Sequence, residues 1–249
     1  MKNFSFFPLV ASLLFILSPP SAIAQNFNVY TEQLPPVHYE EDGQIVGIAT
    51  EIVEELFRLA GYQPRFKMYP WKRSYYLVQN QKNQFIYTLN RTSNREALFK
   101  WIGPILTKRT YLYKFRGRED IQLSTLEDAK KYVTAVILGH SLTTKMEEMG
   151  FEENINIVKT PNKSIQTKVF LNKRCDLITG NEYTIYRALK SVNLTMGDIE
   201  PALFISESGY YLGAHPETDP DIVKRLQNSS DIIMLSNFSE KIIEKYMSR

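Results

Sequence analysis

The sequence predicts an α/β protein made of two lobes that face each other across a central cleft. Three observations predict it. Strand and helix patterns alternate up to about residue 90, the same alternation returns after residue 117, and extended stretches near residues 110–116 and 203–210 link the two series. Alternating strands and helices form a sheet covered by helices. Because the chain crosses twice, we expect a hinged cleft, which is a common ligand site.

The first series contains one helix with a well-defined pattern. In residues 48–62, Ile48, Ile52, Leu56 and Leu59 fall on one face, and Gly61 suits the C-terminal cap. A short strand and a loop with two prolines precede this helix. The rest of the series predicts a strand over residues 63–69, a helix over 70–81, a buried strand over 85–89 and a helix over 93–102.

The second series repeats this order. Its patterns predict helices over residues 124–132, 141–151, 162–174 and 181–191, and strands over 133–139, 155–160 and 175–180. A strand over 208–216 then returns to the first lobe, and two helices over 219–234 and 236–249 close the chain. We therefore expect lobe 1 to comprise residues 25–112 and 207–249, and lobe 2 to comprise residues 113–206.

Residues 1–24 have the pattern of a secretory signal peptide. A single lysine precedes an apolar stretch, two prolines interrupt it, and small residues end it at Ala22-Ile23-Ala24. The alternative is a transmembrane anchor, but the uninterrupted apolar run from Phe6 to Leu17 is too short to span a bilayer comfortably. We expect cleavage after Ala24 and a mature protein in the periplasm.

The composition argues against several classes of protein. The net charge of +3 is too small, and the basic residues are too scattered, to predict a nucleic-acid partner. The one cysteine, Cys175, lies beside an apolar strand pattern, so we expect a buried, inert thiol and no internal disulfide. The histidines His38, His140 and His215 show no spacing typical of a metal site. We expect no metal, no cofactor and a monomeric protein.

The stretch TLNRTSNREALFKWIGPI, residues 88–105, contains a candidate anion site. Ser93 and Glu96 have the spacing of a capping box, which places Arg95 in the first turn of the predicted helix. A helix start offers unsatisfied N–H groups, and a guanidinium can bind a carboxylate with two hydrogen bonds. The alternative is that Arg95 is an ordinary surface charge, and spacing alone does not decide between the two.

Several segments together resemble the bacterial extracytoplasmic solute-binding proteins of family 3, which serve ABC transporters for polar amino acids. They are PPVHYEEDGQIVGIATEIVEEL, PWKRS, TLNRTSNREALFKWIGPI, VILGHSLTTKMEEMGF and RCDLITGNEY. The resemblance covers nearly the whole chain after residue 24. Its most specific part is the Thr-x-x-Arg-Glu segment before an apolar residue, Gly and Pro. It implies a periplasmic binding protein-like fold with two interlobe crossings and a cleft that closes on a small polar solute.

The resemblance also implies roles for individual residues. In amino-acid-binding members, the arginine of the Thr-x-x-Arg-Glu segment binds the ligand carboxylate, which implies that role for Arg95. Small polar residues before it line the pocket, which points to Thr88 and Asn90. The turn of the second lobe, here Gly139-His140-Ser141, offers backbone N–H groups to the same carboxylate, although Ser141 suits a plain helix cap equally well.

Other positions depart from the family pattern. Amino-acid binders usually carry an aspartate after the last strand of the second lobe, which pairs with the ligand ammonium; the matching residue here is Asn181, followed by Glu182. An amide can bond an ammonium but cannot neutralise it. Either Glu182 substitutes for the aspartate, or the ligand lacks the amino group. The usual contacts of the first loop are also changed, and Glu32 stands in that region.

The segment PWKRS resembles a branch of the family that often has no assigned transporter. Trp71 could stack on a ligand, and Arg73 could add a second cationic contact. Alternatively, Trp71 belongs to the core and Arg73 to a solvated face.

We expect a binding protein for a small polar carboxylate-bearing solute, without catalytic activity, that works with an inner-membrane ABC permease. One alternative is a module that reports ligand occupancy to a membrane receptor, since nothing within the chain separates the two roles. A less favoured alternative is a dehydratase-type enzyme on the same scaffold, for which Glu32 and Glu182 are the obvious catalytic acids.

Overall fold

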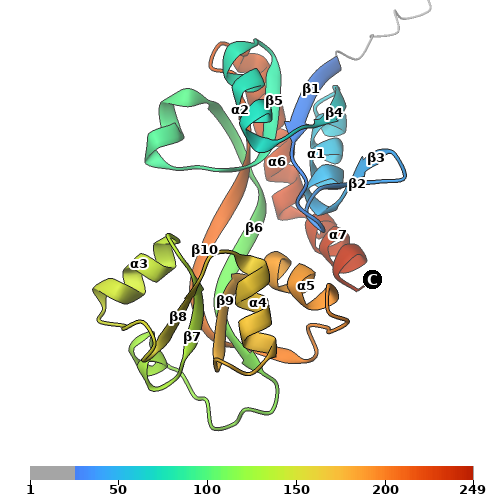
Figure 1. Ribbon diagram of the computed structural model, residues 1–249. Helices are drawn as coiled ribbons and strands as arrows, with labels where there is room; N and C mark the ends of the chain where they lie inside the picture. The colour runs from blue at the N-terminus through green and yellow to red at the C-terminus, as the bar shows by residue number, and fades with distance from the viewer. Residues whose placement is uncertain (1–25, 249) are drawn as a thin grey trace, which may run out of the picture.

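The computed structural model of the protein describes residues 26–248, which form one sheet of eight strands, a separate two-stranded hairpin and the helices that flank them (Figure 1). The predicted signal peptide, residues 1–24, lies outside this described part of the chain. Within residues 26–248, no helix is both long and apolar enough to cross a lipid bilayer.

The upper half of Figure 1, which we call lobe 1, gathers both ends of the described chain. It contains β1 (Asn26–Thr31), β2 (Tyr39–Glu41), β3 (Gln44–Val46), α1 (Ile48–Leu59), β4 (Gln63–Met68), α2 (Trp71–Asn80), β5 (Gln84–Asn90), the 3-10 helix η1 (Ser93–Leu98), α6 (Pro220–Leu235) and α7 (Phe238–Met247). The predicted helix over residues 48–62 is confirmed as α1, which buries Ile48, Ile52 and Leu56. It ends before Gly61, whose φ of 81° suits glycine.

The lower half, which we call lobe 2, repeats the alternation of strand and helix (Figure 1). It contains the 3-10 helix η2 (Glu127–Lys131), β7 (Thr134–Ile137), α3 (Ser141–Glu148), β8 (Ile157–Thr160), α4 (Lys163–Leu171), β9 (Leu177–Asn181) and α5 (Glu182–Lys190). Strand β7 pairs in parallel with both β8 and β9. Since one helix follows each of these strands, the starts of α3, α4 and α5 lie at the same edge of the sheet.

Two long strands, β6 (Lys100–Phe115) and β10 (Ile199–Ala214), pass from one lobe to the other. They pair with each other along almost their whole length, and they place all eight strands in the order β4-β1-β5-β10-β6-β9-β7-β8. Lobe 1 joins this ribbon where Asn90 of β5 faces Tyr210 of β10, and lobe 2 joins it where Asn181 of β9 faces Thr110 of β6. Both predicted crossings are therefore confirmed as strands.

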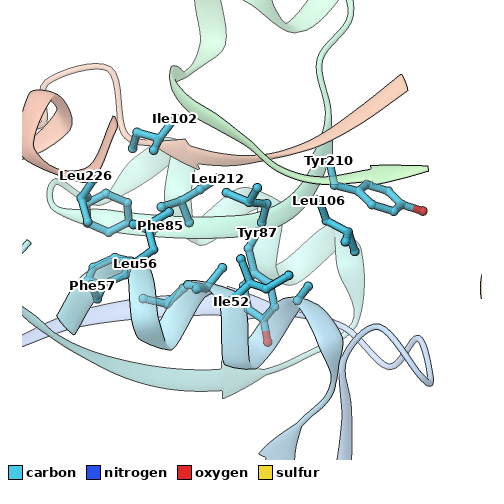
Figure 2. Close-up of a cluster of buried hydrophobic side chains, with 14 of the residues drawn as sticks. Ile52, Leu56, Phe57, Phe85, Tyr87, Ile102, Leu106, Tyr210, Leu212 and Leu226 are labelled. Carbon is cyan, nitrogen blue, oxygen red and sulfur yellow. The ribbon is translucent and has the colours of Figure 1, made fainter. Parts of the chain in front are cut away.

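Each lobe has its own hydrophobic core. In lobe 1, Ile52, Leu56 and Phe57 of α1 pack against Phe85 and Tyr87 of β5 (Figure 2). The same cluster includes residues of both crossing strands and of α6, namely Ile102, Leu106, Tyr210, Leu212 and Leu226. Lobe 2 has two smaller clusters, one of which holds Cys175. Burial raises the pKa of the Cys175 thiol to about 12, which confirms the predicted buried thiol.

The predicted helix over residues 93–102 is wrong. Only residues 93–98 are helical, in the 3-10 helix η1, and the sheet strand β6 begins at Lys100. Glu96 does not close a capping box, because its carboxylate accepts two hydrogen bonds from Arg91, at 2.9 and 2.5 Å. Phe99 and Ile102 are buried in the core, so packing against the sheet decides the extended conformation.

The predicted helix over residues 124–132 is likewise shorter, and only η2 is helical there. The Asp128 carboxylate accepts hydrogen bonds from the backbone N–H groups of Ser124, at 3.1 Å, and Thr125, at 2.9 Å. Short polar side chains that bond nearby backbone favour a tight turn over a continuous helix.

Candidate functional site

A cavity of about 600 Å³ lies between the lobes, against the crossing strands and the edge of lobe 2 where α3, α4 and α5 begin. Its lining residues are Asn90, Lys108, Thr110, Ile137, Gly139, His140, Leu142, Thr143, Lys163, Thr179, Gly180, Asn181, Thr184, Arg187, Ile205, Ser206 and Ser208. Asn90 belongs to lobe 1, and the others belong to lobe 2 or to the crossing strands. This set is polar and basic, and it includes no aspartate or glutamate.

The lobe 2 wall of the cavity is built from strand ends and helix starts. After β7, Gly139 adopts a left-handed φ of 75° and turns the chain, so that His140 precedes α3. After β9, the side chain of Asn181 caps α5 by accepting a hydrogen bond from the N–H of Thr184, at 2.9 Å. Ser141 is the first residue of α3, and its side chain is not part of the described structure.

Lys163, the first residue of α4, carries a partly buried ammonium at this wall. Its Nζ donates to the carbonyl oxygen of Thr179, at 2.6 Å, and to Oε1 of Gln166, at 2.9 Å. Burial, together with the nearby charge of Arg187, lowers the pKa of Lys163 to about 7. Gly180 makes room for it, because a Cβ at this position would stand 2.7 Å from Nζ.

Lys108 is a second partly buried cation, on β6 between the lobes. Its Nζ donates to Oδ1 of Asn90, at 2.6 Å, and lies 4.3 Å from the centre of the Tyr210 ring. Burial lowers the pKa of Lys108, and the charge of Glu182 opposes this shift. The Asn90 side chain is thereby fixed at the end of β5, facing the cavity.

Arg95 lies in η1, near the cavity but not among its lining residues. Its Nη1 donates to the carbonyl oxygen of Asn90, at 3.2 Å, and its guanidinium carbon lies 5.5 Å from the centre of the Tyr75 ring. Within residues 26–248, no carboxylate lies within 4.0 Å of the Arg95 nitrogens. Arg91, by contrast, forms an ion pair with Glu96.

Thr88 is only 6% exposed, and it lies beneath the first loop of lobe 1 rather than at the cavity. Its hydroxyl lies 2.8 Å from Nε2 of His38, which is fully buried. Nδ1 of the same ring lies 2.7 Å from the carbonyl oxygen of Glu32. Because a carbonyl can only accept, Nδ1 carries the proton. The single hydroxyl proton of Thr88 has two acceptors within reach, Nε2 of His38 and the carbonyl oxygen of Tyr87, at 2.6 Å. Burial lowers the pKa of His38 to about 4, so the ring is neutral at pH 7.

The two acidic residues expected near the ligand are absent from the cavity lining. The Glu182 carboxylate accepts from the backbone N–H of Arg109, at 2.9 and 3.1 Å, and it borders a smaller pocket beside α6 and α7. Burial raises the pKa of Glu182 and also that of Glu32, which is partly buried. Neither carboxylate lines the cavity.

Trp71 and Arg73 lie on α2, away from the cavity lining. Trp71 packs at the edge of a small aromatic cluster of lobe 1, with its ring centre 6.2 Å from that of Tyr75. Arg73 lies over the ring of Tyr69, with 4.2 Å from the guanidinium carbon to the ring centre.

The cavity brings together Asn90, His140 and Asn181 from the predicted site residues, and it adds three cations that sequence reasoning missed: Lys108, Lys163 and Arg187. A signal for Lys163 exists in the sequence. Asn162 caps the helix that begins at Lys163, directly after a predicted strand, in the same way that Asn181 caps α5. Helix starts that follow parallel strands gather at one edge, so the two positions could have been considered together.

Comparison with solved structures identifies the fold. The L-cystine solute receptor of Neisseria gonorrhoeae, in its unliganded open conformation, has a TM-score of 0.76 and 16% identity, over 91% of this chain and 94% of that chain. Substrate-binding domain 2 of Lactococcus lactis GlnP, in its open conformation, has a TM-score of 0.73 and 13% identity, over 91% and 97%. At these identities the likeness establishes the fold, which is the predicted two-lobed periplasmic binding protein fold.

A third similar structure is a histidine kinase sensor domain with similarity to periplasmic binding proteins, with a TM-score of 0.62 and 14% identity, over 90% of this chain and 96% of that chain. A search of curated protein sequences found no match. The profile of one family matches residues 28–249, which is most of the chain and confirms the resemblance seen in the sequence. The chain belongs to the bacterial extracellular solute-binding proteins, family 3.

Proposed function

We propose that this protein is a periplasmic receptor that captures a small polar solute carrying a carboxylate, an amino acid or a related acid, by closing its two lobes. It delivers the solute to an ABC-type permease in the inner membrane. The observation that carries the proposal is the cavity between the lobes, whose wall combines ammonium, guanidinium, amide and hydroxyl donors. The lobes are residues 25–112 with 207–249, and residues 113–206.

In this proposal the two lobes contribute different parts of the ligand site. Lobe 2 supplies Asn181, His140 and the free backbone N–H groups at the start of α3, where Ser141 lies. Lobe 1 supplies Asn90 and Arg95. The ribbon of β6 and β10 is the hinge, and closure brings the guanidinium of Arg95 onto the ligand carboxylate.

The experiment is titration calorimetry of the mature protein against a panel of amino acids and organic acids, with small-angle X-ray scattering of the same mixtures. We expect one or more solutes to bind with micromolar or tighter affinity and to reduce the radius of gyration, because closure makes the protein more compact. If no solute binds, or if binding leaves the scattering unchanged, capture by closure is refuted.

A second candidate function is sensing, in which the closed receptor contacts a membrane receptor instead of a permease. The observation in its favour is the similarity to a histidine kinase sensor domain. The two functions differ in what the loaded protein activates. Stimulation of ATP hydrolysis by a permease and ATPase pair encoded beside this gene supports transport, whereas a neighbouring signalling gene whose kinase responds to the loaded protein supports sensing.

A further inference from the structure

We propose that the ligand of the cleft is a small dicarboxylate, a solute with two acidic groups and no cationic group. The inference rests on the proposed function of the cleft as a ligand site, and it narrows the class of solute. Three features of the cavity carry it: the charge of its lining, the absence of carboxylate partners for its cations, and the orientation of the Asn181 amide.

The charge of the lining has one sign. Lys108, Lys163 and Arg187 are cationic side chains, His140 can also become positive, and the lining includes no carboxylate. An α-amino acid brings an ammonium into the cavity as well as a carboxylate. Removing an ammonium from water without an anionic partner is strongly unfavourable. A ligand with two carboxylates instead gives each group of cations a partner.

Among the described residues, no carboxylate lies within 4.0 Å of the nitrogens of Lys108, Lys163 or Arg187, although the charge of Glu182 acts on Lys108 from farther away. The two hydrogen-bond acceptors of Lys163 are a carbonyl and an amide oxygen, both neutral. Elsewhere in the same lobe, Lys159 pairs with both Glu147, at 2.6 Å, and Glu153, at 3.2 Å. Like charges held close together destabilise each other, and an anion between them relieves this repulsion.

The cations fall into two groups, which suits a ligand with two acidic ends. Lys163 is close enough to Arg187 and His140 for their charges to interact. Lys163 begins α4, His140 precedes α3, and Arg187 lies on α5. Lys108 lies apart from them on β6, beside Asn90 of lobe 1. One acidic group can lie against Lys163 and Arg187, and the other against Lys108.

The Asn181 side chain has two donors for the ligand, whereas one lone pair of its oxygen is already used by the cap of α5. Its Oδ1 is engaged by the N–H of Thr184, at 2.9 Å, which identifies the oxygen end of the amide. The NH₂ group remains for a ligand in the cavity that Asn181 lines. An NH₂ group donates to a carboxylate, and the amide as a whole is neutral and cannot balance the charge of an ammonium, so this residue favours an acidic ligand over an α-amino acid.

The test is a matched series of ligands measured by titration calorimetry. Succinate, glutarate and adipate are compared with L-aspartate, L-glutamate and L-2-aminoadipate, which differ from them by one α-ammonium, and with L-glutamine and L-lysine. We expect at least one dicarboxylate to bind ten times more tightly than its amino counterpart. If an α-amino acid binds as tightly as every dicarboxylate, the inference is overturned and the proposed function stands. If none of these solutes binds, the inference is overturned, and the proposed function falls with it only if every other amino acid and organic acid of the panel also fails to bind.

The variant Asn181→Asp adds a negative charge with almost no change of shape, and aspartate is also a good helix cap, so the fold is retained. We expect this variant to bind the preferred dicarboxylate at least ten times more weakly and to narrow or reverse the preference over the amino counterpart. Asn228→Asp is the matched control, because it adds the same charge at an exposed position of α6 outside the cavity. Unchanged dicarboxylate affinity in Asn181→Asp would show that this residue does not face an acidic group.

Discussion

The two walls of the cleft are built differently. On the lobe 2 side, side chains at helix starts are fixed by regular caps: Asn162 accepts from the N–H of Ile165, at 3.0 Å, and Asn181 accepts from that of Thr184. On the lobe 1 side, Asn90 lines the cavity, and Arg95 stands on a short 3-10 helix with one hydrogen bond of 3.2 Å. In our proposal, lobe 2 therefore offers a preformed surface for an anion, whereas the lobe 1 contribution depends on closure.

This difference suggests an order of events. A ligand can first bind the fixed donors of lobe 2, since these need no rearrangement. Closure then adds the guanidinium of Arg95 and removes water from the cleft, which strengthens each charged contact. The predictions below test this division of roles, from the largest expected effect to the smallest.

The largest effect is expected for Arg95→Ala. If Arg95 becomes buried against a ligand carboxylate on closure, its loss should weaken binding by about 4 kcal/mol, about a thousandfold, because the carboxylate is left without its partner. The matched control is Arg91→Ala in the same loop, whose guanidinium is already paired with Glu96. Calorimetry with the preferred ligand separates them; equal effects in the two variants would contradict a special role for Arg95.

A second prediction concerns the interior of lobe 1, where Thr88 and His38 have a structural role beneath the first loop. The pKa of His38 is about 4 in the folded protein, below the ordinary value of 6.5. The unfolded chain therefore binds more protons between these values, so stability is lost as the pH falls from 6.5 to 4. The loss should reach about 3 kcal/mol from this residue.

The measurement is urea unfolding of the wild type and of His38→Gln between pH 4 and pH 7. The variant cannot titrate there, so its stability should fall less on acidification, while ligand affinity at pH 7 should stay within about threefold. His215→Gln is the control, since that ring is not buried. If His38→Gln loses as much stability on acidification as the wild type, the loss comes from groups other than His38.

The fold could be predicted because its signals are local. The buried face of α1, with Ile48, Ile52 and Leu56, is visible as helical spacing, and each predicted strand of lobe 2 has alternating or continuous apolar residues. The η1 segment could not be predicted in the same way. Its helical and extended signals overlap, and Phe99 and Ile102 decide the outcome by packing against a sheet that forms from distant segments.

The site was less accessible to prediction than the fold. Arg95, Asn90 and Asn181 stand in segments that a family pattern marks. Lys163 does not, because its importance comes from the parallel pairing of β7 with β8 and β9, which brings α4 beside α5. The direction of the Asn181 amide is also a property of the folded chain, because the oxygen is oriented by the hydrogen bond from the N–H of Thr184 that caps α5.

A third prediction tests the preformed wall. Lys163→Gln removes the charge but keeps a polar side chain of similar length, and we expect it to weaken binding of a dicarboxylate by about 2 kcal/mol, about thirtyfold. Lys168→Gln is the control, on an exposed turn of the same helix α4. If the two variants bind alike, the anion is not held at the start of α4.

The smallest effect is expected from a change of pH. The pKa of Lys163 is about 7 before ligand binds, and the groups that face it are His140 of α3, Gln166 of its own helix, Thr179 of β9 and Arg187 of α5. Only a charged ammonium attracts an anion, so binding takes up a proton above pH 7, and affinity should fall by at least about threefold between pH 7 and pH 8.5. Burial and the charge of Lys163 lower the pKa of His140 from its ordinary value, so this ring does not gain charge as the pH rises through this range. Calorimetry in two buffers of different ionisation enthalpy measures the proton uptake directly. Uptake that disappears in Lys163→Gln assigns it to lobe 2, whereas uptake that persists there contradicts this assignment.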